Sequence, residues 1–117
     1  FESAAQYIAR TCLEDFEWQG HQFKKDISVI LLLASANRDE EVFPEAGTFK
    51  IDREAKSHLA FGQGKHSCLG GRLVEMELAA ILGALRETSE GFELASEIKW
   101  QNRTGHRWME EGVFRLR

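Results

Sequence analysis

One segment of the sequence, residues 61–70, combines a cysteine with three glycines and two basic side chains. Glycine has no Cβ and admits a positive φ, so Gly62, Gly64 and Gly70 allow a tight bend that lies close against a flat or bulky group. Cys68 lies just before an apolar run that is typical of a helix. The free N–H groups and the dipole at a helix N-terminus favour an anion, which keeps a thiolate available as a ligand or nucleophile.

Two glycine-rich phosphate motifs do not fit this segment. The phosphate-binding pattern G-x-x-x-x-G-K-[ST] fails, because Leu59 stands where its first glycine belongs and His66 stands where its hydroxyl residue belongs. The dinucleotide pattern G-x-G-x-x-G fails at Ser67. What remains is a cysteine site.

Two other interpretations of Cys68 stay open on the residues alone. His66 and Cys68 form a His-x-Cys pair, but tetrahedral zinc needs about four N or S ligands, or three and a water. The sequence holds no C-x-x-C or H-x-x-x-H pair, and the other candidate ligands are scattered: Cys12, His21, His58 and His106. The second alternative is a helix-docking interaction module in which Cys68 is buried and inert, because free cysteine usually packs.

Read as F-x-x-G-x-x-x-C-x-G, the segment closely resembles the haem-binding loop of the cytochrome P-450 family of haem-thiolate monooxygenases. Four positions carry the match: Phe61, Gly64, Cys68 and Gly70. The resemblance continues through the Ala-Asn-Arg-Asp sequence at 36–39, the Ser-His-Leu-Ala sequence at 57–60 and the helix after the cysteine. It covers most of the chain and is strongest to the soluble bacterial branch.

This resemblance implies haem b, iron protoporphyrin IX, with the Cys68 thiolate as the metal ligand. Such a thiolate pushes electron density to the iron and favours O–O cleavage, so that one oxygen atom from O2 enters an organic substrate. Leu69 and Gly70 would donate N–H groups toward the sulfur, and Phe61 would pack beside it. The implied cofactor-binding residues are Arg10, Phe61, Gly62, Gly64, His66, Cys68, Leu69 and Gly70.

The resemblance also implies two partners for the haem propionates. Arg10 precedes an acidic and aromatic hairpin, and a guanidinium on that strand can donate two parallel hydrogen bonds to a carboxylate. His66 would bind the second propionate. The alternatives are a strand arginine in solvent and a loop histidine in water.

Partners and substrate follow only from the family. Lys65 and Arg72 would lie on the proximal surface, where a ferredoxin or flavin reductase delivers electrons, and solvated charges are the alternative. The substrate would be a small organic molecule. The family's oxygen-activating helix and Glu-x-x-Arg helix match nothing in these residues, so we expect no turnover from them alone. Residues 1–117 are expected to be the C-terminal haem-binding part of a single cytochrome P-450 domain.

Composition excludes several classes of protein. The 117 residues are 43% hydrophobic, which suits a globular chain, and the net charge of −4 argues against a nucleic-acid binder. No apolar run reaches the length of about 18 residues that a membrane span needs. Two cysteines without a secreted scaffold favour reduced thiols in the cytoplasm.

The expected fold class is an α+β fragment of the mainly α cytochrome P-450 fold. Its most apolar run, 27–33, predicts a buried central strand, and 73–85 predicts a long helix whose apolar face needs neighbours that the chain does not supply. The remaining expected elements are a strand at 6–12, a hairpin of 15–18 and 22–23, a short helix at 34–41, an irregular meander at 42–53 and strands at 91–95, 98–100 and 113–116.

Two positions depart from the family pattern. Thr48 stands where an arginine commonly helps to lock the Glu-x-x-Arg pair, which predicts a less stable proximal side. Asp26 and Ile27 stand where a glycine turn is usual.

Overall fold

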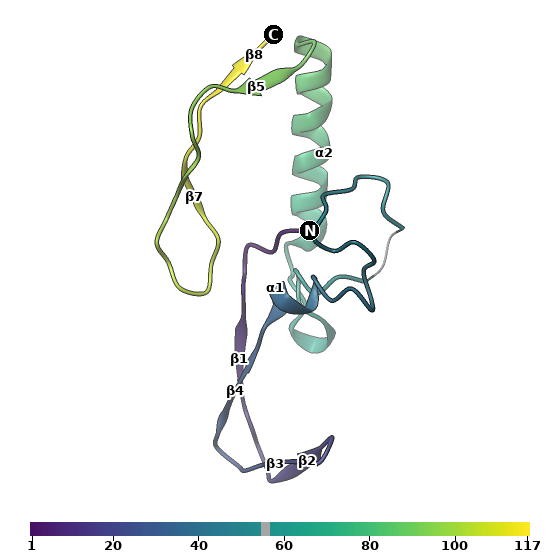
Figure 1. Ribbon diagram of the computed structural model, residues 1–117, viewed down its shortest axis with the longest axis vertical. Helices are drawn as coiled ribbons and strands as arrows, with labels where there is room; N and C mark the ends of the chain where they lie inside the picture. The colour runs from purple at the N-terminus through teal and green to yellow at the C-terminus, as the bar shows by residue number, and fades with distance from the viewer. Residues whose placement is uncertain (55–56) are drawn as a thin grey trace. The chain divides into compact units, whose positions relative to one another are not determined.

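The computed structural model describes residues 1–54 and 57–117 (Figure 1). These residues form two compact units, Phe1–Ala60 and Phe61–Arg117. The first unit carries four short strands and one helical turn, and the second carries the cysteine loop, a long helix and four further short strands.

The first unit begins with two antiparallel strand pairs. Strand β1 (Ile8–Thr11) pairs with β4 (Ser28–Leu31). Between them, β2 (Phe16–Trp18) and β3 (His21–Phe23) form a hairpin, as predicted. Its turn residues both have positive φ, 49° and 79°, which matches the twist of a two-residue hairpin. Stacked rings of Phe16 and Phe23, with centroids 4.7 Å apart, close the pair.

The prediction of a buried central strand at 27–33 is wrong. Strand β4 ends at Leu31, has β1 as its one partner in the described residues, and exposes Ile30 and Leu31. A continuous apolar run is typical of a strand covered on both faces, but the two-stranded ribbon covers little of it. Leu33 is buried and starts helix α1 (Leu33–Ala36).

Helix α1 is shorter than the predicted span of 34–41. After its four residues the chain turns, and the Asp39 carboxylate accepts the N–H of Glu41 at 3.0 Å. This side-chain bond competes with a continued helix, since aspartate favours turns over helix interiors. The meander, 42–53, then holds neither helix nor strand, as predicted. The buried apolar side chains of the described residues lie in this unit: Cys12, Leu33, Phe43 and Ala46.

In the second unit, the long helix is confirmed and extended. Helix α2 spans Gly71–Thr88 and ends where the Ser89 hydroxyl donates to the carbonyl of Leu85 at 2.7 Å. Strand β5 (Phe92–Leu94) pairs with β8 (Phe114–Leu116), and β6 (Lys99–Trp100) pairs with β7 (Met109–Glu111). Three of these strands were predicted, whereas β7, which is labelled in Figure 1, was not.

The apolar face of α2 is exposed. Within the described residues its one buried position is Gly71, while Leu73, Leu78 and Leu82 each expose more than half of their surface. The prediction that the later strands leave this face uncovered is therefore confirmed.

Candidate functional site

The cysteine loop, residues 61–70, turns on two glycines. Gly62 has φ +67° and Gly64 has φ +77°, in the left-handed region where side chains cost free energy. Gly64 begins the single turn η1 (Gly64–His66), which leads through Ser67 to the cysteine. Gly70 has φ −85°, so a positive φ does not account for this third glycine, and its close approach to a flat group stays a prediction.

Backbone hydrogen bonds close the loop upon itself. The N–H of Cys68 donates to the carbonyl of Phe61 at 2.7 Å, and the N–H of Ser67 donates to the carbonyl of Gly64 at 3.1 Å. The first bond joins the two ends of the bend. The position of the cysteine is therefore fixed by main-chain groups rather than by its own side chain.

Cys68 presents an exposed, free thiol three residues before α2 begins at Gly71. Its carbonyl accepts the N–H of Gly71, the first helical residue, at 3.3 Å. Cys12, by contrast, is free but buried at the end of the β1 and β4 ribbon. One accessible cysteine thiol on a loop closed by backbone hydrogen bonds fits a cofactor that is held through one thiolate.

Two other loop residues, Phe61 and Leu69, differ in their exposure to solvent. Phe61 is half-buried, and its ring lies against Gly71, a contact that sequence reasoning missed. Leu69 is fully exposed. The N–H donation from Leu69 and Gly70 toward the sulfur stays a prediction.

Arg10 and His66 lie in different units. Arg10 is exposed on β1, donates from Nη1 to the carbonyl of Ala9 at 2.8 Å, and lines a hollow of about 370 Å³ beside Val29 and Leu31. His66 is exposed in η1. The structure thus brings together the seven loop residues of the predicted set, and the joint role of Arg10 and His66 stays a prediction.

The zinc alternative finds no support in the described residues. No three His, Cys, Asp or Glu side chains gather there in a group that can hold a metal ion. His58 is instead occupied locally, since its Nδ1 accepts the N–H of Ala60 at 3.3 Å.

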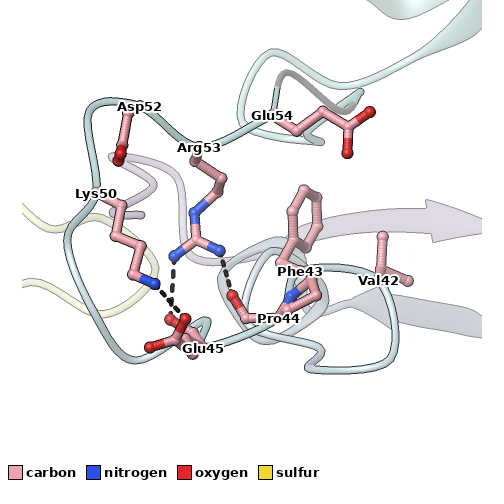
Figure 2. A pocket seen from close by; sticks show the side chains of 8 residues that line it. All are labelled: Val42, Phe43, Pro44, Glu45, Lys50, Asp52, Arg53 and Glu54. Carbon is pink, nitrogen blue, oxygen red and sulfur yellow. Dashed lines mark hydrogen bonds and ion pairs between the residues drawn. The ribbon is translucent and has the colours of Figure 1, made fainter.

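Arg53 holds the meander together (Figure 2). Its guanidinium donates to the carbonyl of Pro44, to that of Glu45 at 3.0 Å and to that of Thr48 at 2.9 Å. Beside it, the Lys50 ammonium pairs with the Glu45 carboxylate and holds the pKa of that carboxyl below its ordinary value. Pro44, Glu45, Lys50 and Arg53 are among the residues that line a cavity of about 280 Å³. Sequence reasoning looked for an arginine at position 48 and missed the one at position 53.

Asn37 joins the chain start to the segment before the loop. Its Nδ2 donates to the hydroxyl of Ser3 at 2.8 Å, and its Oδ1 accepts the N–H of Leu59 at 2.7 Å. Both Ser3 and Asn37 are buried, with 2% and 8% of their surface exposed. A buried amide that satisfies two distant groups is a strong positional constraint. Its place in the Ala-Asn-Arg-Asp sequence was the one signal available beforehand.

A search of the described residues for a helix long and apolar enough to cross a bilayer finds none.

Comparison with known proteins gives consistent results. The model of the family "Cytochrome P450" matches residues 1–88, which include Arg10 and the whole cysteine loop. Among curated proteins, the chain is 46% identical over 85 residues to 20-oxo-5-O-mycaminosyltylactone 23-monooxygenase of Streptomyces fradiae, covering 73% of this chain and 20% of that protein. It is 40% identical over 97 residues to linalool 8-monooxygenase of Pseudomonas putida, covering 83% of this chain and 24% of that protein.

Solved structures agree over nearly the whole chain. The crystal structure of P450BioI in complex with a fatty-acid-ligated acyl carrier protein matches with a TM-score of 0.92 and 34% identity, over 99% of this chain and 30% of that chain. CYP108D1 from Novosphingobium aromaticivorans matches with a TM-score of 0.89 and 33% identity, over 97% of this chain and 28% of that chain. The 117 residues thus span less than a third of these relatives.

These matches confirm the resemblance to bacterial members and the expected fold class, an α+β part of the P450 fold. The family model alone covers well over half of the chain. The chain belongs to the cytochrome P450 family.

Proposed function

We propose that residues 1–117 are the C-terminal haem-binding part of a longer haem-thiolate monooxygenase, in which Cys68 is the axial ligand of haem b. The observation that carries this proposal is the exposed, free thiol of Cys68 on a loop closed by the 2.7 Å bond to the Phe61 carbonyl. The F-x-x-G-x-x-x-C-x-G pattern and the family match support it.

Each loop residue then has a role. Gly62 and Gly64 supply the left-handed bends, which allow the backbone to lie close to a flat macrocycle. Phe61 limits water beside the sulfur, and N–H groups of Leu69 and Gly70 stabilise its charge. Arg10 and His66 neutralise the two propionates, Arg10 through a guanidinium whose geometry suits a carboxylate.

The activity belongs to the longer protein. Haem bound through a thiolate would supply O2 activation and insertion of one oxygen atom into an organic substrate. Two relatives are named as linalool 8-monooxygenase and 20-oxo-5-O-mycaminosyltylactone 23-monooxygenase, which supports a small organic substrate here as well. Electrons would come from a ferredoxin or flavin reductase, and the exposed Lys65 and Arg72 offer it positive charge. Both cysteines are free, which supports a cytoplasmic location.

The test compares two cysteine variants of the full-length protein. We expect the reduced protein with carbon monoxide to absorb at about 450 nm, and Cys68→Ala to abolish this band. The matched control, Cys12→Ala, removes a sulfur that is buried in the other unit and keeps the band. Retention of the band in Cys68→Ala, or stoichiometric zinc without haem in the unmodified protein, would refute the proposal.

A further inference from the structure

We propose that Gly71, the first residue of α2, is a positioning residue for Cys68. It provides the bare backbone surface on which the Phe61 ring rests, and Phe61 in turn holds the backbone of the cysteine. The inference rests on the proposed function only where it concerns haem, because the packing of Gly71, Phe61 and Cys68 is a property of the chain itself.

The contact between Gly71 and Phe61 is close. A Cβ built on Gly71 would lie 3.3 Å from Cδ2, 3.4 Å from Cγ and 3.7 Å from Cε2 of the Phe61 ring. Gly71 is also the buried residue of α2 in the described structure. The ring therefore covers the space that a side chain at position 71 would occupy.

Backbone conformation does not explain this glycine. Gly62 and Gly64 need positive φ, whereas Gly71 lies in a right-handed helix that any L-residue adopts. The contact with Phe61 is the feature that an alanine at position 71 would disturb. Close approach to Phe61, rather than φ, is what favours glycine at this position.

Three contacts link residue 71 to the cysteine. The Phe61 ring lies on Gly71, the Phe61 carbonyl accepts the N–H of Cys68 at 2.7 Å, and the Cys68 carbonyl accepts the N–H of Gly71 at 3.3 Å. Residues 61, 68 and 71 thus form a closed circuit. A displacement at any one of them is passed to the other two.

An added Cβ must displace the ring by a few tenths of an ångström. The backbone of Phe61 has little freedom to absorb this shift. The Phe61 carbonyl is bonded to the N–H of Cys68, and the next residue, Gly62, is held at φ +67°. The displacement is therefore transmitted to the sulfur's immediate surroundings. The sulfur's donor strength toward iron depends on those surroundings.

The experiment uses Gly71→Ala in the full-length holoprotein, with the midpoint potential and the reduced carbon monoxide spectrum as readouts. We expect Gly71→Ala to shift the midpoint potential and to lower the fraction of protein that absorbs at about 450 nm. The matched control is Gly83→Ala, in the same helix, where a Cβ meets no described atom within 4 Å. Gly83 is about 18 Å along the helix from Gly71, so its variant should leave both readouts unchanged.

A second background tests whether the effect passes through the ring. In Phe61→Ala, which lacks the three contacting ring atoms, Gly71→Ala should cause no further shift. If Phe61→Ala does not bind haem, Phe61→Leu replaces it and the further shift should be smaller than in the unmodified protein. A potential in Gly71→Ala equal to that of the unmodified protein would overturn the inference, as would a shift that persists undiminished without the ring.

A haem-independent measurement separates this inference from the proposed function. The unfolding free energies of Gly71→Ala, Phe61→Ala and the double variant should be non-additive, because the two residues are in direct contact. Absence of the absorption at about 450 nm in the unmodified protein would refute the proposed function. Additive unfolding free energies would refute the packing of the Phe61 ring on Gly71, whatever the cofactor.

Discussion

Asp26 shows how a single residue can carry a backbone cost. It has φ +67°, a conformation that costs an L-residue about 1–2 kcal/mol, although aspartate tolerates it better than most. The conformation is kept because the Asp26 N–H donates to the Cys12 carbonyl at 2.8 Å, at the end of the β1 and β4 ribbon. This explains in physical terms why a glycine would suit the turn.

We therefore predict opposite effects for two substitutions at this position. Asp26→Gly should raise the free energy of unfolding by up to about 1 kcal/mol, because the left-handed strain is removed. Asp26→Val should lower it by about 1–2 kcal/mol, since a β-branched residue fits this region poorly. Urea unfolding of the full-length protein checks both. Equal stabilities of the two variants would contradict the strain argument.

Asn37 is a residue whose role lies in distant contacts. Asn37→Ala would leave the buried Ser3 hydroxyl and the part-buried Leu59 N–H unsatisfied. We expect a loss of about 2–4 kcal/mol of unfolding free energy, from two lost hydrogen bonds and their desolvation. Asn37→Asp keeps the acceptor for Leu59 and should lose less. Thermal or urea unfolding of the two variants checks this. Equal losses of unfolding free energy would argue against the Asn37 bridge between Ser3 and Leu59.

At the residue scale, local signals were predictable and distant ones were not. Gly62 and Gly64 form a compact pattern with Cys68, so their positive φ follows from adjacent residues. The Asn37 bridge joins positions 34 and 22 residues away, which no local pattern encodes. Gly71 was missed for the same reason, because its partner is the ring of Phe61 across the loop.

At the scale of elements, the meander depends on one cation. Arg53 donates to three carbonyls that no helix or strand satisfies. Arg53→Ala should lower the free energy of unfolding by about 1–3 kcal/mol. Arg53→Lys should restore only part of that loss, because an ammonium cannot bind three carbonyls with the planar geometry of a guanidinium. Unfolding measurements check this.

The matched comparison is Arg72→Ala. Arg72 pairs with Glu75 at 2.9 Å on the solvent face of α2, with 92% of its side chain exposed. Such exposed helix pairs contribute about 0.5 kcal/mol or less. A loss in Arg72→Ala as large as that in Arg53→Ala would show that the three carbonyl contacts add nothing.

The β2 and β3 hairpin has a pH-dependent anchor. The carboxylate of Asp15 accepts hydrogen bonds from the Lys24 ammonium and the Lys25 N–H, each at 2.8 Å. These two bonds hold the pKa of Asp15 below its ordinary value. A lowered pKa means that this contribution to stability is present above the ordinary aspartate pKa and is lost as pH falls through the folded-state pKa. Asp15→Asn should remove this part of the acid dependence. NMR titration of the hairpin amides checks it, and an unchanged titration would contradict it.

Element types were predicted where the pattern was long. Helix α2 follows from an apolar repeat sustained over several turns, whereas β7, with the sequence Met-Glu-Glu, shows no alternation and was missed. The apolar run at 27–33 correctly predicted a strand, but it wrongly predicted that the strand is buried. Composition predicts that a strand can be buried, and the number of partner strands decides whether it is.

At the scale of the whole molecule, the exposed face of α2 decides how the 117 residues behave alone. Leu73, Leu78 and Leu82 are more than half exposed, and contiguous apolar surface of this kind promotes association. We predict that the isolated polypeptide self-associates in sedimentation experiments, binds the dye ANS and shows no monooxygenase turnover. A monodisperse chain without dye binding, or substrate oxidation with added redox partners, would contradict this.

The contrast between the two sulfurs has a practical consequence. Cys68 is open to solvent while Cys12 is enclosed, so a maleimide reagent should modify the haem-free polypeptide at one position. The chain then carries a built-in attachment point for a fluorophore or spin label at the place where the cofactor is proposed to bind. Quenching of that label on cofactor addition, or protection of the thiol from the reagent, would report binding directly without any engineered residue.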